Sequence, residues 1–171
     1  MSIARHTYSD KEQQFMDILA QYDCVVRRVC FMYAGPDYLF DDLYQETMAN
    51  LWRGMDGFRG DSAISTWIYR TTVNTCISWI RRNRRHARHA DIDEALHLVT
   101  GDDSEHAEFL KQMYRMIANL DALEKAIVMM RLDEKSYEEI ASVTGLTKGN
   151  VATRLFRAKE KLKEMSKNIP L

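Results

Sequence analysis

The chain has 171 residues, of which 46% are hydrophobic, so it can bury the core of one ordinary domain or two small ones. This composition excludes a disordered protein, and no apolar run approaches the roughly 20 residues that span a bilayer. The N-terminus lacks the apolar segment of a signal peptide, so we expect a cytoplasmic protein.

Charge is unevenly distributed along the chain, although the formal net charge is only -1. Residues 91–110 contain seven Asp or Glu and no Lys or Arg, whereas the segments on either side are mildly basic. A basic segment suits a polyanionic partner such as nucleic acid. The distribution predicts two domains, residues 1–90 and 108–171, joined by a flexible acidic linker over residues 91–107.

The cysteines and histidines show no metal-ligand spacing. Cys24, Cys30 and Cys76 lie in apolar periodic segments without a CxxC pair, and the five histidines are scattered. We therefore expect structural, reduced cysteines and no metal or cofactor, because free Cys behaves as a small buried hydrophobe.

A helix is predicted to begin at Ser9, which is spaced from Glu12 as a capping box, and to end at Gly35-Pro36. Its apolar face consists of Phe15, Ile18, Leu19, Tyr22, Val25, Val26, Val29 and Met32. Asp37 is predicted to open a second helix, which carries Asp41 and Asp42 where the helix dipole favours acidic side chains.

A third helix is predicted to begin at Asp61 or Ser62, after a glycine-rich loop. On a helical wheel its apolar arc is separate from one polar stripe, which consists of Trp67, Arg70, Asn74, Ser78 and Arg81. An aromatic ring among amide and guanidinium groups suits single-stranded nucleic acid, because bases stack on rings and Arg neutralises phosphates. Tyr69 falls near the apolar arc, so a core position and a binding position are equally compatible with the pattern.

The second basic domain carries the spacing of a helix-turn-helix. Two capping boxes are predicted, one at Asp121 and one at Ser136, and Gly145 supplies a turn before Thr147 caps a longer helix. Small, turn and packing residues at these offsets suit two short helices that cross steeply. An αα-hairpin with a glycine stop is the simpler alternative.

The longer helix has distinct inward and outward faces. The inward face consists of Val151, Leu155, Ala158, Leu162 and Met165, and the outward face of Asn150, Thr153, Phe156, Arg157 and Glu160, flanked by Arg154. An exposed Phe among cations and hydroxyls is more typical of a DNA recognition helix than of a solvated face, because apolar groups contact thymine methyls in the major groove.

Three motifs resemble bacterial RNA polymerase sigma factors of the sigma-70 family. They are DDLYQE at residues 41–46, FRGDSAISTWIYRTTVN at 58–74 and SYEEIASVTGLTKGNVATRLFRAKEKL at 136–162. They occur in the order of the second and fourth conserved regions, without a region-three domain, as in the small extracytoplasmic-function (ECF) subfamily. The resemblance covers nearly the whole chain. It implies an all-α protein of two small helical domains, the C-terminal one with a helix-turn-helix.

The resemblance also implies partners and residue roles. The set for the unpaired non-template strand of the minus-ten element is Phe58, Arg59, Ser62, Trp67, Tyr69, Arg70, Asn74, Arg81, Arg82, Arg84 and Arg85. The set for the minus-thirty-five duplex is Lys148, Asn150, Thr153, Arg154, Phe156, Arg157 and Lys161. The set for the clamp helices of the polymerase beta-prime subunit is Asp41, Asp42, Leu43, Gln45 and Glu46, although the helix dipole explains the two aspartates equally well. The further partners implied are the beta flap and an anti-sigma factor, which can be membrane-linked in this subfamily.

Two departures and two alternatives accompany this resemblance. Ala152 stands where the family often has a basic residue, and Leu120-Asp121-Ala122 lacks the proline that the family often has after the helix preceding region four.

A stand-alone helix-turn-helix regulator would explain residues 136–163 but would leave the DDLYQE and Trp67 surfaces unused. A helical protein-binding adaptor would explain neither cationic face. We expect no enzyme, because paired catalytic carboxylates, a metal-ligand cluster and a phosphate loop are missing from the sequence.

Overall fold

The computed structural model describes residues 10–34, 40–83 and 105–167, and these residues form helices joined by short turns. The elements are α1 (Asp10–Tyr33), α2 (Phe40–Gly54), the 3-10 helix η1 (Met55–Gly57), α3 (Ile64–Asn83), α5 (Glu105–Ala118), α6 (Ala122–Leu132), α7 (Tyr137–Thr144) and α8 (Lys148–Lys167). The predicted all-α class is thus confirmed. The predicted cap at Ser9, the break at Gly35-Pro36, the start at Asp37 and most of the acidic linker lie outside the described residues.

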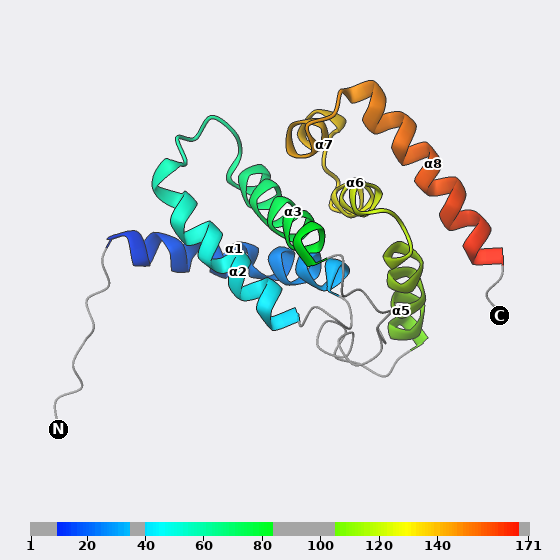
Figure 1. The fold of residues 1–171 in the computed structure, drawn as a ribbon, viewed down its shortest axis with the longest axis horizontal. Helices are drawn as coiled ribbons and strands as arrows, with labels where there is room; N and C mark the ends of the chain where they lie inside the picture. The colour runs from blue at the N-terminus through cyan, green and yellow to red at the C-terminus, as the bar shows by residue number, and fades with distance from the viewer. Residues whose placement is uncertain (1–9, 35–39, 84–104, 168–171) are drawn as a thin grey trace.

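Helices α1, α2 and α3 pack on one another and form the first half of the molecule (Figure 1). Each contributes side chains that are almost completely buried, because the apolar residues of each helix recur with helical spacing. The centre of this core contains Val26, Val29, Cys30, Leu43, Leu51, Ile68, Val73 and Cys76. The apolar face predicted for the first helix is therefore confirmed in its C-terminal half, where burial is greatest.

The loop before α3 differs slightly from the prediction. The helix begins at Ile64 instead of Asp61 or Ser62. Gly60 has a φ of 78°, in the left-handed region that favours glycine, so the chain is still turning at this point. The Ala63 carbonyl then accepts the N–H groups of Thr66 and Trp67, at 3.0 and 3.1 Å. Residues 61–63 therefore belong to the loop.

The cysteines follow the prediction only in part. All three are free thiols, and Cys30 and Cys76 are buried as expected, but Cys24 is exposed. The burial expectation is wrong for Cys24 because the buried face of α1 passes through Val26, Val29 and Cys30 and leaves Cys24 outside it.

Helices α5 to α8 form the second half, in which α8 lies across α6 and α7 (Figure 1). Both predicted capping boxes are present: Asp121 with Glu124 begins α6, and Ser136 with Glu139 begins α7. Gly145 has a φ of 72° and donates its N–H to the Ala141 carbonyl at 2.9 Å, so it ends α7 as predicted. Helix α7, this turn and the longer α8 that packs on α7 form the predicted helix-turn-helix.

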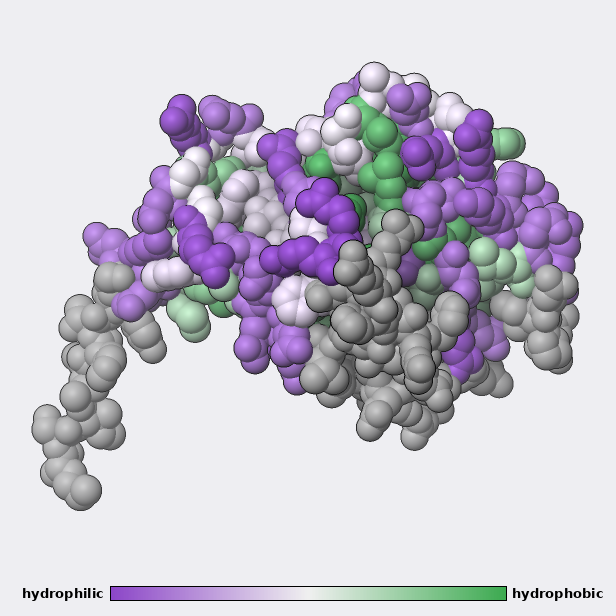
Figure 2. Space-filling model, viewed as in Figure 1, coloured by the Kyte–Doolittle hydropathy of each residue, from purple (hydrophilic) through white to green (hydrophobic). Residues whose placement is uncertain are grey.

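The two halves contact each other. Helix α7 packs on α3, and α5 and α6 pack on α1. The Phe31 and Tyr114 rings meet edge to face with centroids 6.1 Å apart, and the Tyr33 hydroxyl donates a hydrogen bond to the Ala122 carbonyl. Figure 2 shows mainly hydrophilic side chains over the face seen in Figure 1, with hydrophobic ones gathered near α7 and α8.

Candidate nucleic-acid and polymerase interface

The α3 stripe, defined as Trp67, Arg70, Asn74, Ser78 and Arg81, begins beside the glycine-rich loop. The Trp67 and Phe58 ring centroids lie 5.3 Å apart, and the rings are tilted by 41°. A Cβ added to Gly54 would come within 3.3 Å of the Trp67 ring, so this glycine allows the ring to sit close to the end of α2. Trp67 is half-buried and Asn74 is exposed. The loop and helix thus present two neighbouring rings and an amide to solvent.

Tyr69 and Arg70 lie at the junction between the two halves. Tyr69 is 2% exposed, which favours the core alternative left open by its sequence position. Its hydroxyl and the Arg70 Nε are both buried and have no hydrogen-bond partner within the described parts of the chain. The Arg70 Nη2 donates to Ser142 Oγ of α7 at 3.3 Å. Arg70 is therefore bonded to the second half of the molecule, and Tyr69 lines a hollow together with residues 132–135 of that half.

Basic residues continue the surface at the C-terminal end of α3. Arg81 and Arg82 are exposed, and Arg82 lies 5.7 Å above the Trp79 ring and 3.9 Å from the Glu46 carboxylate of α2. In the loop before the helix, Arg59 is exposed and Ser62 is half-buried. Arg84 and Arg85, predicted as phosphate contacts, lie outside the described residues.

Helix α2 presents an acidic outer face beside these arginines. Asp41, Asp42 and Gln45 are exposed and Glu46 is half-buried. Leu43, which the resemblance placed in the polymerase-binding set, is 0% exposed. Its side chain belongs to the core, where it anchors α2, and is not part of the outer face.

Tyr44 fixes α2 to α1 through a polar cluster. Its hydroxyl donates to the Asp23 carboxylate and accepts a bond of 3.3 Å from the Arg27 guanidinium, which also lies 4.5 Å above its ring. Burial, together with the bond to Asp23, raises the pKa of Tyr44 to about 12. The tyrosine therefore stays protonated and holds the acidic helix in place at ordinary pH.

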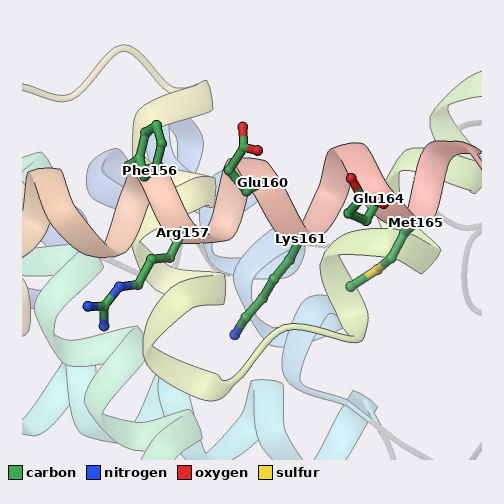
Figure 3. Close-up of a pocket in the computed structure, with 6 residues that line it drawn as sticks. All are labelled: Phe156, Arg157, Glu160, Lys161, Glu164 and Met165. Atoms are coloured by element: carbon green, nitrogen blue, oxygen red, sulfur yellow. The ribbon is translucent and has the colours of Figure 1, made fainter.

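Helix α8 presents the predicted outward face. Asn150, Thr153, Phe156 and Arg157 are exposed, and Phe156 is 65% exposed. In Figure 3, Phe156 and Glu160 point away from the side of the helix on which Lys161 and Met165 lie. The inward face is confirmed by Val151, Leu155 and Ala158, which are buried.

A hollow of about 600 Å³ runs along α8 (Figure 3). Among the described residues, its lining comes from α8: Phe156, Arg157, Glu160, Lys161, Glu164 and Met165. The hollow therefore lies on the outer surface of this helix.

Three of the cations predicted to contact DNA already have acidic partners within the second half. Lys148 pairs with Glu138, and Arg154 lies 3.8 Å from the Asp121 carboxylate. Lys161 donates to both carboxylate oxygens of Glu124, at 2.6 and 2.8 Å. Glu124 is only 4% exposed, so this pair fixes α8 to the start of α6.

Neither a metal centre nor a membrane segment emerges from the described residues. Within residues 10–34, 40–83 and 105–167, no group of three or more His, Cys, Asp or Glu side chains is placed to hold a metal ion. None of the helices described is long and apolar enough to cross a membrane.

Comparisons with known proteins match the two halves to two conserved regions of one family. Residues 18–86 match the family model of sigma-70 region 2, and residues 110–162 match that of sigma-70 region 4. ECF RNA polymerase sigma-E factors of Salmonella typhimurium and Escherichia coli are each 36% identical over 132 residues, which cover 70% of this chain and 69% of theirs. The chain belongs to the ECF subfamily of sigma-70 factors.

Solved structures support the same fold. The sigma factor RpoE in complex with the anti-sigma factor NepR from Bartonella quintana has a TM-score of 0.69 at 19% identity, over 95% of this chain and all of that one. CnrH, in complex with the cytosolic domain of CnrY, has a TM-score of 0.67 at 20% identity, over 93% of this chain and 91% of that one.

The family match favours a sigma factor over the other functions that the sequence left open. This ECF sigma factor acts in transcription initiation, and sigma factors are generally not enzymes. A stand-alone helix-turn-helix regulator is not favoured, because the region 2 match includes α2, α3 and the loop between them.

Proposed function

We propose that the sigma factor binds core RNA polymerase through the outer face of α2, reads the minus-thirty-five duplex with α8 and captures the unpaired minus-ten strand with α3. Residues 1–90 and 108–171 are the two functional domains in this proposal, and the protein acts in the cytoplasm without catalytic chemistry of its own. The observation that supports it most is that two surfaces combine aromatic rings with polar or cationic side chains: Phe58, Trp67 and Asn74 at the start of α3, and the outward face of α8.

The α3 surface suits a single strand better than a duplex. The neighbouring Phe58 and Trp67 rings offer stacking planes, which contribute about 1–3 kcal/mol for each base, and the exposed Asn74 amide can read a base edge. Arg81 and Arg82 follow on the same helix and can neutralise phosphates. Preferential binding of the unpaired strand is enough to shift DNA toward the open form without nucleotide hydrolysis.

The α8 surface suits the major groove. Thr153, Phe156 and Arg157 are exposed at the front of the helix-turn-helix, where a recognition helix contacts base edges and phosphates. Lys148 and Lys161 reach the DNA backbone in this proposal only by sharing or exchanging their bonds to Glu138 and Glu124. Arg157 has no ion pair among residues 10–34, 40–83 and 105–167, so it is the stronger candidate for a direct contact.

Three protein contacts complete the proposal. Asp41, Asp42, Gln45 and Glu46 bind the beta-prime clamp helices, and the second domain binds the beta flap. An anti-sigma factor is the third partner, as the structures of CnrH with CnrY and of RpoE with NepR support.

Two substitutions test the division of labour between the domains. With reconstituted holoenzyme on a promoter selected from genomic DNA, Asn74→Ala should impair strand opening, measured by permanganate reactivity, and leave closed-complex affinity nearly unchanged. Arg157→Ala should weaken closed-complex binding by about 1–3 kcal/mol, because it removes a duplex contact. If both variants weaken closed binding equally, the assignment of separate roles is wrong.

A further inference from the structure

The junction hollow is a space of about 400 Å³ between the two halves of the molecule. The first half lines it with residues of α1 and α3, and the second half lines it with residues 132–135, at and after the end of α6. Pockets that bind small molecules commonly have volumes of about 300–1,000 Å³ and often lie between domains. The junction hollow therefore has the size and position of a ligand site.

Two polar side chains that line the junction hollow have buried atoms without a hydrogen-bond partner. Tyr69 is 2% exposed, and its hydroxyl has no partner within residues 10–34, 40–83 and 105–167. The Nε of Arg28 is also buried without a partner within the same residues. A buried donor without an acceptor costs free energy, so both groups favour a molecule that brings an acceptor into the hollow.

The charged side chains around the junction hollow already have partners. Arg28 forms an ion pair with Asp133, and the Lys135 ammonium lies 2.9 Å from Ser65 Oγ and 3.5 Å from the Glu139 carboxylate. Burial raises the pKa of the Asp133 carboxyl, although Arg28 opposes this effect. A second negative charge beside this carboxylate is therefore costly. The hollow favours an uncharged occupant over an anion.

Apolar side chains supply another part of the wall. Tyr22 and Val25 of α1 are half-buried there, and Leu132 at the end of α6 is 52% exposed. Covering the exposed leucine removes apolar surface from water, which is favourable. The wall therefore suits a ligand with an apolar body as well as an acceptor atom.

We infer that the junction hollow is a binding site for a small uncharged molecule with an amide or ketone oxygen and an apolar body. Such an oxygen has two lone pairs, so it accepts hydrogen bonds from both the Tyr69 hydroxyl and the Arg28 Nε. The apolar body packs on Val25 and Leu132. With about 30 Å³ for each water-sized group, the hollow holds about a dozen non-hydrogen atoms. This site goes beyond the proposed function, because it involves neither DNA nor core polymerase.

Benzamide is a suitable probe, because it joins an amide oxygen to an apolar ring. The full chain, with isotope-labelled Ile, Leu and Val methyl groups, is titrated with benzamide and followed by NMR. We expect the Val25 and Leu132 signals to shift together and to saturate, with a dissociation constant of about 1–10 mM for a molecule this small. Leu51 and Leu155, in the cores of the two halves, are internal controls whose signals should not shift.

Two analogues of similar shape test the chemical class of the ligand. Benzoate replaces the amide with a negative charge, so it should bind at least about threefold more weakly than benzamide beside Asp133. Benzylamine carries a positive charge and no acceptor oxygen, so it should bind more weakly still. If benzoate binds as tightly as benzamide, the uncharged class is wrong. If benzylamine does so, the two donors do not select the ligand.

Two conservative substitutions test the donors. Tyr69→Phe removes the hydroxyl, and Arg28→Lys keeps a positive charge opposite Asp133 but removes the Nε donor. Each should weaken benzamide binding by about threefold to tenfold, the usual effect of one lost hydrogen bond. Tyr114→Phe and Arg27→Lys change a tyrosine and an arginine that do not line the hollow, so they should leave binding unchanged.

Thermal unfolding of the free protein separates a ligand donor from a structural hydroxyl. Because the Tyr69 hydroxyl lacks a partner in the described parts of the chain, Tyr69→Phe should leave the unfolding temperature unchanged or raise it. A clear decrease would contradict the inference, because the hydroxyl would then be bonded within the protein.

The site itself is overturned if benzamide well above the expected dissociation constant shifts neither the Val25 nor the Leu132 signals. It is also overturned if Tyr69→Phe and Arg28→Lys both bind benzamide as tightly as the original protein. Promoter opening plays no part in these measurements, so their failure is distinct from a failure of the proposed function.

Discussion

At the residue scale, similar lysines on one helix have different structural roles. Lys148 and Lys161 both lie on α8 and both pair with glutamates, but Glu138 is exposed whereas Glu124 is 4% exposed. An exposed pair contributes little because solvent screens it, whereas a buried carboxylate left without its cation is costly. Lys161 therefore positions α8 against α6, in addition to the DNA contact proposed for it.

Substitution of the two lysines should separate these roles. Lys161→Ala should lower the free energy of unfolding by about 1–2 kcal/mol, below the usual effect of breaking a buried pair because Lys161 itself is half exposed. Lys148→Ala should leave stability almost unchanged. Urea unfolding followed by circular dichroism measures both, and equal losses of stability would contradict the positioning role of Lys161.

Residue-scale prediction from sequence works where the cause is local. Periodicity alone identifies Phe156 as exposed and Leu155 as buried, and the structure confirms both. The partner of Lys161 could not be predicted, because Glu124 lies 37 residues away and its pattern indicates only a helix cap. Leu43 shows a different limit. The family motif placed it in the polymerase-binding set, but the motif does not show which way a side chain points, and Leu43 is buried.

At the scale of elements, the turn between α7 and α8 sets the geometry of the helix-turn-helix. Gly145 occupies the left-handed region and has open space around its Cα, so a side chain there meets backbone strain and no steric clash. Gly149, in the first turn of α8, also has open space but no positive φ. These two glycines allow the strain to be tested by itself.

Alanine substitution should act in opposite directions at the two glycines. Gly145→Ala should destabilise the protein by about 1 kcal/mol and weaken duplex binding, because α8 loses its fixed approach angle. Gly149→Ala should be neutral or slightly stabilising, because alanine is the better helix former. Thermal unfolding checks the pair, and a loss at Gly149 as large as that at Gly145 would contradict the strain argument.

At the scale of the whole molecule, the two capping boxes and the family resemblance predict the architecture. How the two halves pack on each other could be learned only from the structure. Capping boxes at Asp121 and Ser136 operate within three residues, so sequence spacing reveals them. The junction depends on pairs such as Arg28 with Asp133, which are 105 positions apart and carry no local signature. The charge asymmetry that predicts two domains gives no information on how they contact each other.

The central claim is that this chain confers promoter specificity on core RNA polymerase. Run-off transcription tests this claim most directly. Purified core polymerase is supplied with the sigma factor and promoter fragments selected from genomic DNA, and core polymerase alone is the control. We predict discrete transcripts that depend on the sigma factor and are lost in Asn74→Ala with Trp67→Ala. If the protein neither binds core polymerase nor directs initiation at any selected promoter, the account is contradicted.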